Sequence, residues 1–165
     1  MGAAERLAAL GLELPAVAAP VAAYVPAVVD GDTVFTSGQL PFVDGTLPAT
    51  GKVGEGAGLV APQDAAALAR TAALNALAAV AAAVEAAGGP AGADALDRVA
   101  RVVKVVGFVA SDPAFTGQPA VVNGASHLLH EVLGDAGVHA RSAVGVAVLP
   151  LDSPVEVELV VRLHP

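Results

Sequence analysis

The stretch that most constrains the fold is HARSAVGVAVLPLDSPVEVELVV, residues 139–161, which consists of two extended segments joined at Leu149-Pro150. Side chains alternate between the two faces of a strand, so each segment divides its residues into two sets. In the second segment one set carries charges at Glu156, Glu158 and Arg162, and the other is apolar (Val155, Val157, Leu159 and Val161). This alternation predicts a strand with one face on the core and the carboxylates facing away from it.

The first segment divides in a different way. Arg141 shares one face with small residues (Ala143, Gly145 and Ala147), and the other face carries Ser142 and three valines (Val144, Val146 and Val148). We assign the valine face to the core. The small face should then admit the close approach of a partner subunit or a ligand.

The rest of the chain supplies further strands and two helices. A turn at Asp30-Gly31-Asp32 predicts a hairpin, residues 62–87 and 119–133 predict helices, and the β-branched run at 96–111 predicts a buried strand. The order β-β-α-β-α-β-β indicates one α+β domain over residues 1–165, a mixed sheet with both helices on one face. Residues 1–17 are expected to form an N-terminal helical extension, and residues 46–61, rich in Gly and Pro, a long loop.

Composition excludes several classes of protein. The net charge is −8 and there is no run of Lys or Arg, so the chain lacks the basic surface that nucleic acid requires. There is no cysteine, which excludes disulfides and thiolate catalysis and agrees with a cytoplasmic location. The longest apolar run, residues 76–84, is about half of the ~20 residues that span a membrane, so we expect a soluble protein without a membrane partner.

Charges are scarce, at 15% of residues, so Arg141 and Glu156 within apolar segments need a reason. One hypothesis is that they form cross-strand ion pairs on a solvated sheet face. The other is that Arg141 offers a planar fork to a substrate carboxylate while Glu156 handles a proton or a water. Spacing alone does not choose between them.

Other polar residues suggest weaker hypotheses. His127 and His130 stand three apart on a predicted helix, but no third ligand is evident, so we expect no metal site. We interpret His139 as a loop residue without a role, although it lies near Arg141. Lys104 in the strand at 96–111 is either a charge at a sheet edge, which we favour, or a cleft residue.

Four segments occur in an order that resembles the RidA (YjgF) family, also called the reactive-intermediate or 2-iminoacid deaminase family. They are AYVPAVVDGDTVFTSGQLP, TAALNALAAVAAAVEAAGG, VVKVVGFVASDPAF and ARSAVGVAVLPLDSPVEVE, and the resemblance covers about residues 18–162. It implies a chorismate-mutase-like fold that assembles as a homotrimer with clefts between subunits. Family members of the archetypal kind hydrolyse enamines and imines to 2-oxoacids and ammonia, without a metal or an organic cofactor.

The resemblance also assigns site residues. Arg141 matches the arginine that binds the substrate carboxylate, and Glu156 matches the carboxylate that positions or activates the hydrolytic water. Tyr24, Ser37 with the neighbouring Gly38, and Asn123 match residues that line the cleft. Ala143 departs from the family by replacing a frequent cysteine, and the long loop and N-terminal extension resemble a divergent subgroup.

Three functions follow from these residues. The first is hydrolysis of 2-imino or enamine acids, or of a related small molecule that carries a carboxylate, which would make the chain a deaminase-like hydrolase. The second is a trimer that binds a small carboxylate ligand without catalysis. The third is the endoribonuclease or translation-inhibitor activity attached to the family's name, which the acidic charge and the scarcity of aromatic residues disfavour.

Overall fold

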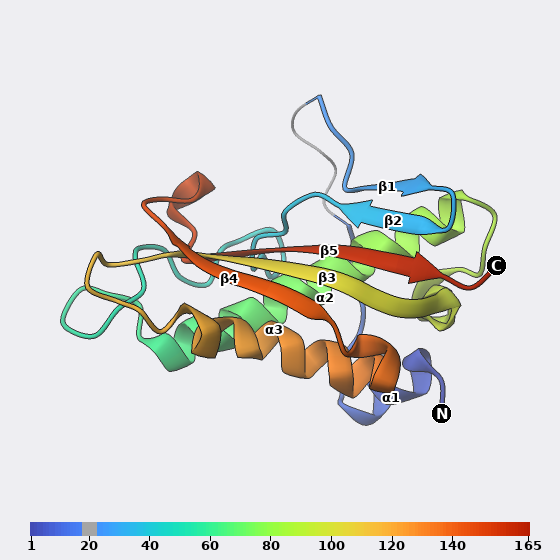
Figure 1. Cartoon of the computed structure of the whole chain (residues 1–165), viewed down its shortest axis with the longest axis horizontal. Coiled ribbons are helices and arrows are strands. Elements are labelled where there is room, and N and C mark those ends of the chain that lie inside the picture. The colour runs from blue at the N-terminus through green and yellow to red at the C-terminus, as the bar shows by residue number, and fades with distance from the viewer. Residues whose placement is uncertain (18–22) are drawn as a thin grey trace.

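The computed structural model describes residues 1–17 and 23–165, and Figure 1 shows the arrangement of the chain. Five strands form one sheet, and two long helices pack against it. The strands are β1 (Ala27–Asp30), β2 (Thr33–Thr36), β3 (Val99–Ala110), β4 (Ala140–Val146) and β5 (Val155–Leu163). The helices are α1 (Ala3–Ala9), α2 (Pro62–Ala86) and α3 (Gln118–Leu133), with 3₁₀ turns η1 (Gly92–Arg98), η2 (Gly134–Gly137) and η3 (Pro150–Asp152).

The sheet has the order β1-β2-β5-β3-β4. Strand β5 lies beside the first hairpin and pairs antiparallel with both β2 and β3. Strand β4 pairs parallel with β3 and forms one edge of the sheet. The mixed sheet predicted from the sequence is therefore present, and the longest strand, β3, lies inside it.

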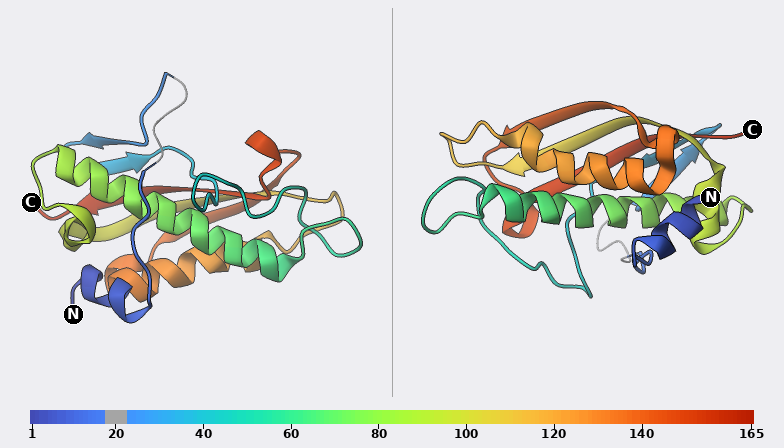
Figure 2. Two further views of the ribbon diagram at one scale, coloured as in Figure 1. Left: turned by 180° about the vertical axis from the view of Figure 1, so that it is seen from behind. Right: turned by 90° about the horizontal axis from the view of Figure 1, so that it is seen from below.

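Both long helices cover the same face of the sheet, as Figure 2 shows from below. Helix α2 buries twelve residues, of which four are Leu or Val, and the other eight are alanines (Ala65, Ala69, Ala72, Ala73, Ala76, Ala78, Ala79 and Ala81). Small residues let the two helices approach closely, since a Cβ at Gly124 of α3 would collide with the backbone of Ala66 of α2. Helix α2 is long and apolar enough to span a bilayer, but 61% of its most apolar window is buried inside the protein.

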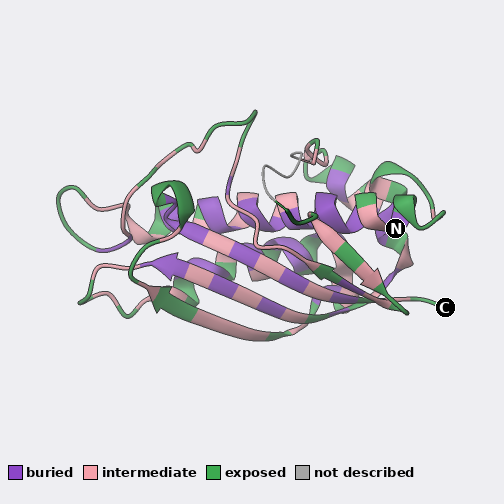
Figure 3. Ribbon diagram, turned by 90° about the horizontal axis from the view of Figure 1, so that it is seen from above, coloured by how far each residue is buried: buried purple, intermediate pink, exposed green. Residues whose placement is uncertain are grey.

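The opposite face of the sheet, which we call the open face, is only partly covered. Figure 3 shows buried residues alternating with partly exposed ones along β3 and β5. In β5 the residues Val155, Val157, Leu159 and Val161 are buried, which confirms the face predicted for this strand. The open face carries apolar side chains that are about half exposed (Val28 51%, Phe35 46%, Val144 44%).

The prediction for β4 was wrong, because its faces are reversed. Arg141 pairs with the buried Val105, so Arg141 and Ala143 face α3, whereas Val144 pairs with Phe108 on the open face. Beyond Arg141, helix α3 lies close to this face of the strand, and a Cβ at Gly145 would meet Gln118 Nε2 at 2.8 Å. The valines of this strand therefore lie on the open face, and the small residues Ala143 and Gly145 lie on the face toward α3.

Two other predicted boundaries differ. The strand predicted at 96–111 begins at Val99, because residues Gly92–Arg98 form the turn η1. The N-terminal helix is limited to Ala3–Ala9, and it is fixed to η1 by a hydrogen bond of 2.6 Å from the Ala3 backbone N–H to Asp97 Oδ1. Between β2 and α2, residues 46–61 contain only isolated bridges, such as those of Val53 with Val60 and Ser111.

Candidate functional site

The Arg141 side chain leaves the edge strand β4 and ends against α3. Its Nη1 donates to Asn123 Oδ1 at 2.8 Å and to Ser126 Oγ at 3.1 Å, and its Nη2 donates to the Pro119 carbonyl at 3.2 Å. Three of the five guanidinium N–H donors are thus used by one helix. The remaining two, on Nε and Nη2, donate to no partner within residues 1–17 and 23–165. They are available to an anionic oxygen.

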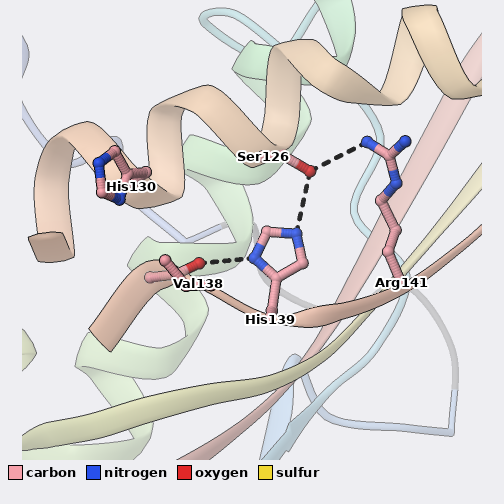
Figure 4. A pocket seen from close by; sticks show the side chains of 6 residues that line it. Ser126, His130, Val138, His139 and Arg141 are labelled. Atoms are coloured by element: carbon pink, nitrogen blue, oxygen red, sulfur yellow. Dashed lines mark hydrogen bonds between the residues drawn. The ribbon is translucent and has the colours of Figure 1, made fainter. Parts of the chain in front are cut away.

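His139 extends the hydrogen-bond network of Arg141 through Ser126, as Figure 4 shows. His139 Nδ1 lies 2.6 Å from the Gly137 carbonyl, and its Nε2 lies 2.9 Å from Ser126 Oγ. A carbonyl only accepts, so Nδ1 carries the ring proton, and in the neutral ring Nε2 accepts the Ser126 hydroxyl. Burial lowers the pKa of His139; the bond to Gly137 opposes this, and the Arg141 charge adds to it. The ring is therefore neutral at pH 7. His139 Nδ1 donates to the Gly137 carbonyl, and Ser126 Oγ donates to His139 Nε2 while it accepts from Arg141 Nη1.

These groups line a shallow cleft of about 280 Å³ between α3, η2 and the start of β4. Its walls are Ser126, His130, Gly137, Val138, His139 and Arg141. We call Asn123, Ser126, His139 and Arg141 the arginine half-site. An arginine held at a fixed position beside an open cleft can bind a carboxylate or hold a polarised carbonyl oxygen.

Glu156 lies elsewhere, on the open face of β5. It pairs across the sheet with Phe108, and its carboxylate packs so tightly on Gly38 that a Cβ there would collide with it. Burial raises the pKa of Glu156 above its usual range, and the Glu158 carboxylate on the same face adds to the effect. The carboxyl group therefore holds a proton to higher pH than an exposed glutamate does, which suits a group that exchanges protons with a ligand.

Of the other predicted cleft residues, Asn123 belongs with Arg141, whereas Gly38 contacts Glu156 and is preceded by Ser37. Ser37 follows β2, and its hydroxyl donates to the Val25 carbonyl at 2.6 Å, which fixes the segment beside Tyr24. Tyr24 itself is 54% exposed. We call Tyr24, Ser37, Gly38 and Glu156 the glutamate half-site.

The two half-sites do not meet within one chain. Arg141 and Glu156 stand on opposite faces of the sheet, with β3 between their strands and a register offset of three residues. Strand spacing and rise separate their Cα atoms by roughly 14 Å. The cross-strand ion pair considered from the sequence is absent, because Arg141 bonds to α3 instead.

The positions of His127, His130 and Lys104 decide the hypotheses made for them from the sequence. His130 lines the Arg141 cleft, whereas His127 lines a separate hollow between α2 and α3, so the two do not converge. Lys104 is not at a sheet edge, since β3 pairs on both sides, and its Nζ donates to Ser142 Oγ at 3.0 Å. Sequence reasoning missed Ser126 and gave His139 no role. The signal for Ser126 was its position three residues after Asn123, on the same helix face.

Comparisons with known proteins agree with this fold. The family model described as "YjgF/chorismate_mutase-like, putative endoribonuclease" matches residues 4–163. Protein TCP17 of Trypanosoma cruzi is 44% identical over 162 residues, a match that covers 98% of this chain and 94% of that protein.

Solved structures give the same result. Atu1372 of Agrobacterium tumefaciens, a protein of unknown function, is 39% identical, with a TM-score of 0.85 and coverage of 98% of this chain and 92% of that one. TdcF of Escherichia coli with bound serine is 27% identical, with a TM-score of 0.58 and coverage of 90% and 94%. The chain has the chorismate-mutase-like fold and belongs to the YjgF (RidA) family.

Proposed function

We propose that this chain hydrolyses small 2-imino or enamine acids to 2-oxoacids and ammonia, in clefts formed between the subunits of a cytoplasmic homotrimer. The observation that carries the proposal is the fixed guanidinium of Arg141. Three acceptors on α3 hold it, and two donors remain for a substrate carboxylate. The solved relative TdcF contains serine, an amino acid with such a carboxylate.

The assembly supports the reaction by joining the half-sites. The open face carries half-exposed apolar side chains at Val28, Phe35 and Val144, a surface suited to burial against further copies. Arg141 lies on the edge strand β4, and Glu156 lies on that open face. If the β4 edge of one copy meets the open face of the next, the arginine half-site and the glutamate half-site face each other.

The reaction requires only that these groups orient the substrate and transfer a proton. Arg141 binds the carboxylate by parallel hydrogen bonds and so fixes the position of the C=N carbon. The ionised Glu156 carboxylate accepts a proton from the attacking water, and its raised pKa lets the resulting carboxyl group return that proton to the departing nitrogen. Water adds to the carbon, the C–N bond of the resulting carbinolamine breaks, and the products are a 2-oxoacid and ammonia.

The first experiment measures 2-oxoacid formation from 2-iminobutyrate and 2-iminopropionate generated in situ, with semicarbazide competing for the imine. The wild type should accelerate hydrolysis, and Arg141→Ala and Glu156→Gln should not. Glu158→Gln is the matched control, because it removes a carboxylate from the same face of β5 and should keep the activity. If the wild type does not hydrolyse imines yet binds carboxylates through Arg141, the chain is a ligand-binding trimer.

A mixing experiment tests whether the site lies between subunits. Arg141→Ala and Glu156→Gln chains, each inactive, are unfolded together and refolded as mixed trimers. If each cleft takes Arg141 from one subunit and Glu156 from the next, random mixing restores about a quarter of the clefts. A mixture that stays inactive, although light scattering shows mixed trimers, would place the whole site within one subunit and contradict the proposal.

A further inference from the structure

We propose that Ser126 and His139 form a nucleophile–base pair in the Arg141 cleft, which accepts acyl groups from small activated esters or thioesters. This activity is separate from imine hydrolysis. It depends on Ser126 of α3, Arg141 of β4 and His139 in the short segment between η2 and β4, and it does not require Glu156.

The first argument is geometric. A serine nucleophile needs a base within hydrogen-bond reach and a third group that orients the base. Ser126 Oγ lies 2.9 Å from His139 Nε2, and the Gly137 carbonyl holds His139 Nδ1 at 2.6 Å. The carbonyl fixes the tautomer, which leaves the lone pair of Nε2 directed at the hydroxyl, as Figure 4 shows.

The second argument concerns charge. Arg141 Nη1 donates to the same Ser126 oxygen at 3.1 Å, which stabilises negative charge as the hydroxyl proton leaves. Burial keeps the pKa of His139 low, so the ring is unprotonated and able to accept the proton at pH 7.

The third argument is access. Ser126 and His139 are both partly exposed, and both line the cleft of about 280 Å³. A cleft of that size admits a short acyl group. The charged and titratable groups facing the pair are Arg141 from β4 and His130 from α3, and no carboxylate among residues 1–17 and 23–165 lines the cleft.

The reaction proceeds in two balanced steps. His139 Nε2 takes the hydroxyl proton while Ser126 Oγ forms a bond to the carbonyl carbon, and the π electrons move to the carbonyl oxygen. The tetrahedral adduct then expels the alcohol or thiol, which takes the proton from Nε2 and leaves acyl-Ser126. Water attacks this ester with the same base, which releases a carboxylic acid and restores the serine.

The test uses the full-length chain, 4-nitrophenyl acetate and a fluorophosphonate probe. We expect a burst of 4-nitrophenol and a covalent adduct that peptide mass mapping locates on Ser126. His139→Gln should slow the labelling by about 100-fold or more, as expected for loss of a general base. Ser126→Ala should abolish it, and this variant should fold, since alanine is favoured within a helix.

A matched control is Ser142→Ala, which removes a hydroxyl from β4 on the open face, and this variant should label as the wild type does. Absence of an adduct on Ser126 would overturn the proposal. Equal labelling of the His139→Gln variant, or an adduct on His139 itself, would also overturn it. Glu156→Gln should still label, so a failure here is distinguishable from a failure of imine hydrolysis.

Discussion

The contact between β3 and α3 yields the sharpest prediction about how the fold holds Arg141. A Cβ on Gly107 would lie 2.5 and 2.6 Å from the two γ carbons of Val122, whereas carbon atoms in contact prefer about 3.5–4.0 Å. Val122 is buried and β-branched, so its side chain has essentially one rotamer within the helix. In Gly107→Ala, helix α3 must therefore move away from the sheet by about 1 Å.

The expected cost is that of an overpacked core, about 1–3 kcal/mol in the free energy of unfolding. For a domain of this size each kcal/mol lowers Tm by about 2–4 °C. The assay is urea and thermal denaturation followed by circular dichroism at one fixed chain concentration, since assembly also affects Tm. Activity should fall as well, because the moved helix carries Asn123 and Ser126, which hold Arg141.

A double-mutant cycle tests the reasoning. Val122→Ala alone should cost about 2 kcal/mol through lost burial and a small cavity. In Gly107→Ala/Val122→Ala the new methyl group occupies space that the valine vacates, so the pair should be less destabilised than the sum by about 1 kcal/mol or more. Additive effects, or a Gly107→Ala variant as stable as the wild type, would refute the close contact.

Two further predictions concern Glu156. Because its pKa is raised, the folded state binds more protons than the unfolded state at pH values above 4.5, so stability should fall as pH rises from 4.5 through the raised pKa. Glu156→Gln should remove this decline, which urea denaturation across that pH range will show, and an unchanged slope would exclude Glu156 as its source. Gly38→Ala should displace the Glu156 carboxylate and reduce kcat/KM for imine hydrolysis by about 100-fold, while stability changes by less than about 1 kcal/mol. Steady-state kinetics and denaturation of the same preparation separate the two effects. If Gly38→Ala has the kinetics of the wild type, the displacement of the Glu156 carboxylate does not affect catalysis.

The element order and one sheet face were predictable because strong local patterns determine them. Helix α2 has apolar residues at helical spacing and ends before Gly88-Gly89, and β5 alternates without interruption. The sequence did not predict the turn η1, because Leu96 matches the apolar pattern of the strand that in fact begins at Val99. Its interruption depends on the docking of α1 on Asp97, a contact between residues far apart in the sequence.

The faces of β4 were predicted wrongly for a related reason. Alternation tells which residues share a face but not which face is packed, and we took valine to mark the core. The close crossing of α3 selects small residues there, and this distance depends on the whole fold. The same applies to the site, where Arg141 and Asn123 were both named but the role of Ser126 and His139 as their neighbours required the register of β4 against α3.

The alanine-lined face of α2 has a consequence for how this protein can change. A buried leucine or methionine loses rotamer freedom when the chain folds, whereas alanine has none to lose. A core assembled from eight such residues on one helix is therefore ordered at little entropic cost, but it contains few spare methylene groups. Random substitution should damage it mainly through added volume, so tolerated variants at these positions should be confined to glycine, serine and alanine.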